Sequence, residues 1–248
     1  MTADVVDGRT AETLQRKIVL AAADVLEQDG LDAMSTRTVA TRAGVFPPTI
    51  FRLFGDKDGL LEAVGEHGFE TYLQAKSRIP RSDDPVADLR LAWDLHIEFG
   101  LTRPAYYVLV FGQARSGHLS RAGRKAVAEL QRMMTRVAAA GRLRMSVERA
   151  TAIMHAAGVG VVSTMNSTPP DTRDLDTAVV TRDLVFDAIT APLAADSPPA
   201  GKGAGPATAA MGLRAVLAEA GELPLSPGEK LLLLELLNRL ADVPKATG

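Results

Sequence analysis

The sequence of 248 residues contains no cysteine, which excludes disulfide bonds, thiolate nucleophiles and cysteine-ligated metal ions. A chain without cysteine fits a reducing cytoplasm, where we expect this protein to be located. Aromatic residues make up only 4% of the chain, and alternating β-branched residues are scarce. Alanine and leucine are abundant instead, so the composition predicts an all-α protein. The hydrophobic share of 46% is ample for a buried core.

An excess of positive charge is also lacking, because the formal net charge is −2. This balance excludes a polybasic coat for nucleic acid, but a local basic patch remains compatible with DNA binding. The N-terminal residues are polar and acidic, unlike a signal peptide. The longest apolar run, residues 231–237, is interrupted by Glu235 and is too short to cross a bilayer. We therefore expect no membrane partner.

Motifs of catalysis and cofactor binding are missing as well. The chain has no phosphate-binding loop, dinucleotide fingerprint or Gly-x-Ser-x-Gly elbow. Its histidines have no metal-ligand spacing among themselves or with carboxylates; they are His67, His96, His118 and His155. The sequence therefore predicts neither an enzyme nor a bound metal or cofactor.

Helical periodicity and capping signals cover almost the whole chain. After a disordered stretch at residues 1–9, the first helix is expected to begin near Thr10 and to stop at Asp29-Gly30. Asp56 is expected to cap the fourth helix. A capping box of Ser226 and Glu229 is expected to open the last helix, at about 227–241. The other helices are predicted at 35–43, from Pro47, at about 85–101, after Pro104, and at about 119–140, 146–166, 172–190 and 209–220.

Residues 36–57 read TRTVATRAGVFPPTIFRLFGDK and concentrate four basic side chains around one acid. In a helix-turn-helix register, Ala40 lies where two helices approach most closely. Gly44 lies in the turn, where a positive φ is needed. The side chains left on the outer face are suited to phosphates; they are Arg37, Arg42, Thr49 and Arg52. The alternative is a helical hairpin with a few solvated arginines.

Two adjacent prolines, Pro47 and Pro48, open the second helix of this pair. They lose no intrahelical hydrogen bond there, because the N–H groups of the first turn have no partner within the helix. Together with Phe46, their rings present an apolar surface. A thymine methyl group is a natural apolar partner in a major groove.

The segment MSTRTVATRAGVFPPTIFRLFGDKDGLL resembles the DNA-binding signature of the TetR family of one-component transcriptional regulators. The resemblance covers about 50 residues and implies that Phe46, Pro47 and Pro48 meet bases. Two residues depart from the family pattern: Phe51 replaces a tyrosine that usually bonds a phosphate, and Phe46 replaces a serine or threonine cap. The positions implied to touch the DNA backbone are Ser35, Arg37, Thr49, Phe51 and Lys57. Arg52 is added to the predicted DNA-contact residues because it faces outward in the helix-turn-helix register.

The resemblance also implies a domain layout. Residues 1–62 are expected to form the DNA-binding domain, and residues 63–195 a bundle for ligand binding and dimerisation. A flexible linker is expected at 196–208 from its proline and glycine content. Residues 209–248 extend beyond the usual length of the family.

A pocket for a small apolar ligand is the second implication of the resemblance. Aromatic and methionine side chains of the 63–195 region suit such a ligand as a set, although core packing is the simpler explanation for any one of them. The predicted ligand-binding residues are Trp93, His96, Ile97, Tyr107, Phe111, Met134, Met154 and His155.

A homodimer is the third implication. The segment 151–164 is rich in alanine and glycine, which allows another helix to approach closely, and the 172–190 helix has matching apolar residues. Packing within one chain is the alternative. The predicted interface residues are Ala157, Val161, Val179 and Phe186.

The sequence therefore predicts a repressor that binds a near-palindromic DNA operator as a homodimer and is released by a small, largely apolar ligand. An alternative is a ligand-independent, DNA-bound protein whose leucine-rich C-terminal helix recruits a protein partner. That helix is amphipathic, so it is expected to dock on its own core, on the dimer partner or on another protein.

Overall fold

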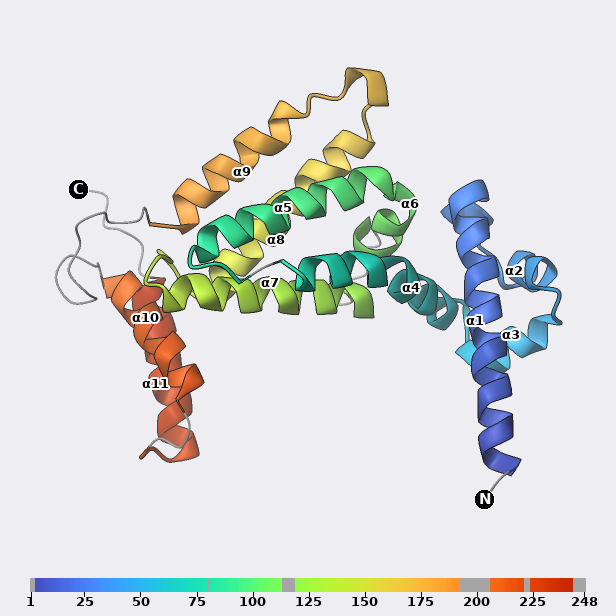
Figure 1. Ribbon diagram of the computed structural model, residues 1–248, viewed down its shortest axis with the longest axis horizontal. Helices are drawn as coiled ribbons and strands as arrows, with labels where there is room; N and C mark the ends of the chain where they lie inside the picture. The colour runs from blue at the N-terminus through green and yellow to red at the C-terminus, as the bar shows by residue number, and fades with distance from the viewer. Residues whose placement is uncertain (1–2, 80, 113–118, 192–205, 221–223, 243–248) are drawn as a thin grey trace. The chain divides into compact units, whose positions relative to one another are not determined.

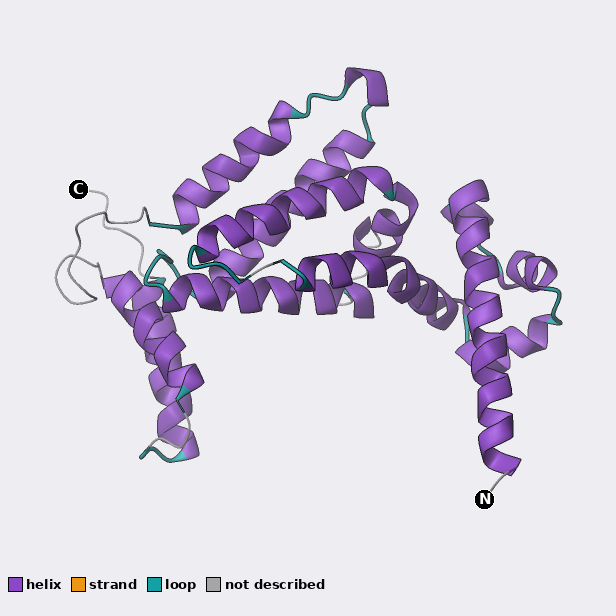
Figure 2. Ribbon diagram, in the orientation of Figure 1, coloured by secondary structure: helices purple, strands orange, loops and turns teal. Residues whose placement is uncertain are grey.

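The computed structural model describes residues 3–79, 81–112, 119–191, 206–220 and 224–242. Figure 2 shows that these residues form helices joined by loops, with no strand among them. The only extended pairing described is an isolated antiparallel bridge between Leu143 and Thr190. The predicted all-α class is therefore confirmed. None of the described helices is long and apolar enough to span a membrane.

The chain divides into two compact units, which we describe separately. Unit 1 comprises residues 1–78 and 98–126, and unit 2 comprises residues 79–97 and 127–248. Helices α5 (Pro85–Thr102) and α7 (Arg121–Ala139) each contribute residues to both units.

Unit 1 begins with four helices in the predicted order. They are α1 (Ala3–Asp29), α2 (Thr36–Ala43), α3 (Pro47–Phe54) and α4 (Lys57–Ser77), and a single 3₁₀ turn at Leu31–Ala33 joins the first two. Figure 1 shows α2 and α3 beside α1, against which both pack. The expected start of α1 was wrong: residues 3–9 are helical, and Thr10 lies inside the helix. Gly8 is the weakest helix former before it, and one glycine costs only about 1 kcal/mol.

The second part of unit 1 contains a short helix and an irregular one. Helix α6 (Pro104–Tyr107) runs directly into a π-helical turn, η2 (Val108–Gly112). The sequence predicted the short helix after Pro104 but gave no sign of the π-helix. Such turns are rare and often accompany functional positions.

Unit 2 contains helices α8 (Val147–Asn166) and α9 (Asp176–Ile189), which pack against each other. A 3₁₀ turn at Pro170–Thr172 lies between them. Helices α10 (Pro206–Glu219) and α11 (Pro227–Ala241) follow and lie side by side as a hairpin (Figure 1). The predicted capping box of Ser226 and Glu229 is present. Residues 196–205 of the predicted linker lie outside the described residues, and helix α10 already includes residues 206–208.

Candidate functional site

Helix α2 begins and ends at the residues that the sequence predicts. The Ser35 side chain accepts a hydrogen bond from the Thr38 backbone N–H at 3.0 Å, which satisfies one of the free donors of the first turn. Gly44 ends the helix in the left-handed conformation, with φ of 64° and ψ of 41°. Ala40 is fully buried at the helix contact. The turn between α2 and α3 therefore has the predicted helix-turn-helix geometry.

Helix α3 has one buried residue and a largely exposed outer surface. Ile50 is inaccessible to solvent and anchors the helix in the core. Pro47 and Pro48 occupy its first turn, and Phe46 precedes them without a side-chain cap. Phe46 is 82% exposed and Phe51 is 51% exposed. Two large aromatic rings on a helix surface favour an apolar contact with another molecule.

Exposed basic side chains occur on α2, α3 and the start of α4. Arg37, Arg52 and Lys57 are exposed, and Lys57 is the first residue of α4, which Asp56 caps through a 2.7 Å hydrogen bond from the Gly59 N–H. All nine predicted DNA-contact residues lie on or beside α2, α3 and the start of α4. We call them the α2–α3 surface: eight are exposed and Thr49 is half-buried; they are Ser35, Arg37, Phe46, Pro47, Pro48, Thr49, Phe51, Arg52 and Lys57.

Arg42 has a different environment from the other outward-facing arginines. Its guanidinium group pairs with Asp29 at 3.0 Å and donates to Gln28 at 3.2 Å, both in the last turn of α1. This contact fastens α2 to α1. Arg42 is therefore engaged within the module and is less available for phosphate than Arg37 or Arg52.

The core beneath the α2–α3 surface includes residues from α6 and η2. Tyr106 and Leu109 are buried in the same cluster as the apolar residues of α1 to α4. Burial, together with the nearby Glu27 carboxylate, raises the pKa of Tyr106 to about 12. Glu27 also pairs with Arg103 at 2.7 Å, just before α6. Sequence reasoning did not assign these residues to the DNA-binding module, because they lie far along the chain from it.

Two glycines of α4 permit this packing. The Tyr106 ring occupies the space that a Cβ atom at Gly68 would need, and a Cβ at Gly65 would lie 3.5 Å from Val110. Glycines inside a helix can serve either as a hinge or as a place of close contact. Gly65 and Gly68 lie inside an uninterrupted α4 and face another helix, so close packing explains them.

An aromatic cluster in unit 1 contains two of the predicted ligand-binding residues. The rings of Tyr107 and Phe111 are 5.0 Å apart, and Phe111 is 5.4 Å from Phe69. Phe69 is also 4.7 Å from Phe99 and 5.0 Å from Tyr72. Burial raises the pKa of Tyr107, and the adjacent Tyr72 raises it further. Both hydroxyl groups are therefore neutral at ordinary pH.

The other six predicted ligand-binding residues belong to unit 2. Trp93, Ile97, Met134 and Met154 are buried, and His96 and His155 are half-buried. Gly158 lets α8 approach α5, because a Cβ there would lie 3.1 Å from the His96 ring and 3.7 Å from Trp93. Residues Trp93 and His96 of α5 therefore lie against α8, about one turn from Met154 and His155.

The predicted dimer residues differ in exposure. Phe186 is fully buried, with the Arg90 guanidinium 4.6 Å above its ring, and Val161 is also buried. Ala157 is half-buried and Val179 is exposed. Five more residues of α8 and α9 that face solvent have small or apolar side chains. We call them the α8–α9 face; they are Ala152, Ala156 and Gly160 on α8 and Val180 and Leu184 on α9.

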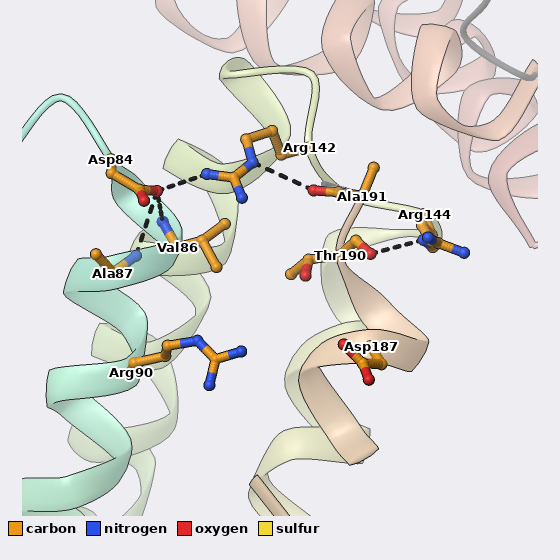
Figure 3. A pocket seen from close by; sticks show the side chains of 9 residues that line it. All are labelled: Asp84, Val86, Ala87, Arg90, Arg142, Arg144, Asp187, Thr190 and Ala191. Carbon is orange, nitrogen blue, oxygen red and sulfur yellow. Dashed lines mark hydrogen bonds and ion pairs between the residues drawn. The ribbon is translucent and has the colours of Figure 1, made fainter. Parts of the chain in front are cut away.

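A polar pocket of about 350 Å³ lies between the start of α5, the α7–α8 connection and the end of α9 (Figure 3). Arg142 pairs with Asp84 and donates from Nε to the Ala191 carbonyl at 3.2 Å. Arg144 donates to the Thr190 carbonyl at 2.6 Å. These groups fasten the end of α9 to α5 and α8. The lining includes none of the predicted ligand-binding residues.

Comparison with known families identifies the N-terminal module. Residues 18–64 match the family described as "Bacterial regulatory proteins, tetR family". The chain is 36% identical over 81 residues to the HTH-type transcriptional regulator BetI of Paraburkholderia phytofirmans, covering 32% of this chain and 42% of that protein. The BetI protein of Paraburkholderia xenovorans is 40% identical over 67 residues, or 26% of this chain and 34% of that protein. The chain thus matches less than half the length of these curated relatives.

Solved structures extend the similarity beyond this module at the level of the fold. A transcriptional regulator from Rhodococcus sp. RHA1 has a TM-score of 0.56 at 20% identity over 71% of this chain and 95% of its own. A TetR-family regulator from Streptomyces coelicolor has a TM-score of 0.52 at 21% identity over 70% and 96%. These structures share the N-terminal helix-turn-helix followed by a helical bundle. Residues 18–64 are thus a DNA-binding module of the tetR type, and the chain shares the fold of these solved regulators.

Proposed function

We propose that this protein is a one-component repressor, which binds a near-palindromic operator as a homodimer and releases it when a small, largely apolar ligand binds. The observation that carries the proposal is the α2–α3 surface, which combines exposed cations on α2, α3 and the start of α4 with the exposed ring of Phe46. Cations neutralise phosphates without reading sequence, whereas apolar groups contact base edges such as the thymine methyl. The surface thus has one component for affinity and one for specificity.

The DNA-binding half of the proposal requires rigid presentation of α3. Ile50 is fully buried, Gly44 fixes the turn, and Arg42 pairs with Asp29 to fasten α2 to α1. We expect the first turn of α3, which begins at Pro47, to enter the major groove. Arg37 and Lys57 are then expected to contact phosphates on either side of it.

The homodimer is supported by the α8–α9 face. Leu184 is 66% exposed, and Val180 lies one turn before it. The exposed residues of the α8–α9 face on α8 have small side chains, which lets a partner helix approach closely. Two copies of each helix would build a four-helix interface. A twofold arrangement of this kind suits two half-sites about 34–36 Å apart.

The α6–η2 segment supplies a route from a ligand to the DNA-binding module. Tyr106 lies in the core of α1 to α4, whereas the next residue, Tyr107, stacks with Phe111 in the aromatic cluster. We propose that a ligand entering beside Tyr107 and Phe111 displaces α6. Tyr106 and the Glu27–Arg103 pair would transmit this displacement to α1. A coupling of about 1–3 kcal/mol between the two sites is typical and weakens DNA binding roughly 5–150-fold.

The decisive experiment selects bound DNA from a random double-stranded pool and then titrates the selected site with and without an apolar ligand library. We expect a near-palindrome with half-sites one helical turn apart, bound by a dimer, and an affinity that falls when a ligand is present. Selection of no preferred sequence by the purified protein at low salt would refute the proposal. The double variant V180E/L184E tests the dimer separately, because it is expected to bind a half-site weakly without pairing.

The second candidate function is recruitment of a protein partner by the C-terminal helix, without a ligand. It is favoured by the exposure of Leu231, Leu232, Leu236 and Leu240 on α11. The two candidates differ in the ligand titration, because only the repressor loses DNA on ligand binding. We also propose, from the absence of cysteine, that the protein acts in the cytoplasm.

A further inference from the structure

The α10–α11 hairpin is fastened to the start of α8 by polar contacts. Arg214 of α10 pairs with Glu148 of α8 at 2.5 Å. Asp242, just after α11, accepts hydrogen bonds from the Ser146 N–H at 3.0 Å and from the Ser146 hydroxyl at 2.7 Å. Ser146 is the N-cap of α8, so these contacts tie the hairpin to a defined point of unit 2.

The apolar residues of the hairpin are distributed in an unusual way. Its buried side chains are mostly small, namely Ala210, Met211, Ala215, Leu237 and Ala241. Six of its large apolar side chains are instead between 46% and 70% exposed; they are Leu213, Val216, Leu231, Leu232, Leu236 and Leu240. Soluble proteins rarely leave a large apolar surface open unless it meets a partner.

Three of these leucines form one ridge along α11. Leu232, Leu236 and Leu240 are spaced by four residues, so they lie on the same face of the helix. We call them the leucine ridge. Leu231 is the most exposed of the leucines, but its position in the helical register places it on a different side. Ridges with this spacing pack into the matching grooves of another helix.

The charges beside the leucine ridge fit a second copy of the same helix. Glu235 and Arg239 lie on one flank of the ridge and form an ion pair within the helix at 2.5 Å. If two α11 helices pair antiparallel with Leu236 at the centre, each Arg239 comes within about two residues of Glu235 on the other helix, along the same flank. The surface is therefore complementary to itself in both apolar contacts and charge. A helix carrying only one sign of charge on this flank would repel its copy.

We propose that the α11 helices of two copies pair antiparallel through the leucine ridge, about a twofold axis at Leu236. The hairpin also adjoins the α8–α9 face, because Arg149 in the first turn of α8 donates to the Asp242 carbonyl at 3.3 Å. The exposed stripe of α8 begins one turn later, at Ala152. The inference extends the proposed homodimer and is independent of the proposed DNA contacts and ligand.

The absence of cysteine allows a direct test in the full-length protein. In the variant L236C, oxidised glutathione converts the two introduced thiols of a dimer into one disulfide and yields two molecules of reduced glutathione. We expect rapid formation of a cross-linked dimer, since residues on a twofold axis come within disulfide distance. The matched control is L231C, which is at least as exposed but lies off the ridge. Equal cross-linking of the two variants would overturn the proposal.

A second variant separates ridge pairing from general association. In the L236C background, L232E is expected to slow cross-linking at least tenfold, because the twofold arrangement places Leu232 opposite Leu240 of the other copy. The control L91E alters a similarly exposed leucine on α5 and is expected to leave the rate unchanged. Unchanged cross-linking in L232E/L236C would refute the ridge pairing. Slowing of L91E/L236C to the same extent as L232E/L236C would also refute it. In either case the leucines would serve a different partner. R37A is expected to weaken DNA binding without changing the cross-linking rate, so failure of either proposal can be recognised separately.

Discussion

The ring of Tyr106 occupies the position that a side-chain carbon at residue 68 would fill. This relationship joins α4 to α6 at the point where α6 enters the core of the DNA-binding module. It requires glycine at position 68 because the neighbouring core also holds the ring in place.

We expect G68A to lower the free energy of unfolding by about 1–3 kcal/mol, because the added methyl group overpacks the interior. Chemical denaturation followed by circular dichroism measures this change. The control is G212A, since a Cβ at Gly212 would meet no atom within 4 Å. Alanine there is expected to be neutral or to stabilise α10 by up to about 1 kcal/mol.

A double-mutant cycle tests whether the Tyr106 ring is the cause. In a Y106A background the space beside residue 68 is open, so G68A is expected to cost less than it does in the native protein. An equal cost in both backgrounds would show that the ring is not responsible. G68A is also expected to alter the response of DNA binding to ligand, because it acts on the proposed route between them.

The basic residues of the α2–α3 surface give a prediction about salt dependence. We expect K57A to weaken binding to all DNA sequences and to reduce the slope of log K against log salt by about 0.9 for each phosphate that is no longer neutralised. A dimer carries two copies of Lys57, so the slope is expected to change by about 2. Fluorescence anisotropy over a series of salt concentrations gives the slope.

The matched control for this measurement is R132A. Arg132 is an exposed residue of α7 that pairs with Glu129, and it lies in unit 2, outside the DNA-binding module. We expect its removal to leave both affinity and slope unchanged. A change of sequence preference in K57A at constant salt slope would contradict the phosphate role of Lys57.

Phe51 gives a prediction of increased affinity. It is 51% exposed on α3 and occupies the position where the family usually has a tyrosine. A hydroxyl group in F51Y is expected to add a phosphate hydrogen bond worth about 1 kcal/mol in each half-site, or roughly thirtyfold in the dissociation constant of a dimer. The salt slope is expected to stay constant because no charge is added. Equal or weaker binding by F51Y would place residue 51 away from phosphate.

The helix-turn-helix could be predicted because its signals are local. Ser35 and Asp56 cap helices through bonds to residues three positions later, and Gly44 supplies a conformation that few other residues adopt. These interactions do not depend on the rest of the chain. The sequence therefore placed α2 and the starts of α3 and α4 within one residue of their observed positions.

The orientation of α9 could not be predicted in the same way. Apolar residues occur on all its sides, because Phe186 faces the interior while Val180 and Leu184 face solvent. Periodicity alone cannot distinguish these sides, so Phe186 was assigned to an interface although it is covered by its own chain. The role of Gly68 was equally hidden, since it depends on Tyr106 from another helix.

Asp88 gives a prediction about acid stability in unit 2. This buried carboxylate accepts hydrogen bonds from the Ser82 hydroxyl at 2.6 Å and from the Arg136 guanidinium at 2.8 Å. Burial alone would raise the pKa of Asp88, but the bonds from Ser82 and Arg136 outweigh it and hold the pKa below its ordinary value. Arg136 also donates to the Ser82 carbonyl at 3.1 Å, which closes the network.

We expect D88N to lower the free energy of unfolding at pH 7 by about 1–3 kcal/mol, because a charged hydrogen-bond acceptor is removed from a buried position. A carboxylate with a lowered pKa in the folded state stabilises the protein fully above about pH 4, its pKa when unfolded. That contribution is lost as the pH falls towards the folded-state pKa. The difference between native protein and D88N is therefore expected to shrink below about pH 4, as urea unfolding at a series of pH values would measure.

D83N, at an exposed neighbouring aspartate, is the control and is expected to have little effect at pH 7. A D88N difference that stays constant from pH 7 to pH 3 would show that the charge of Asp88 does not contribute to stability.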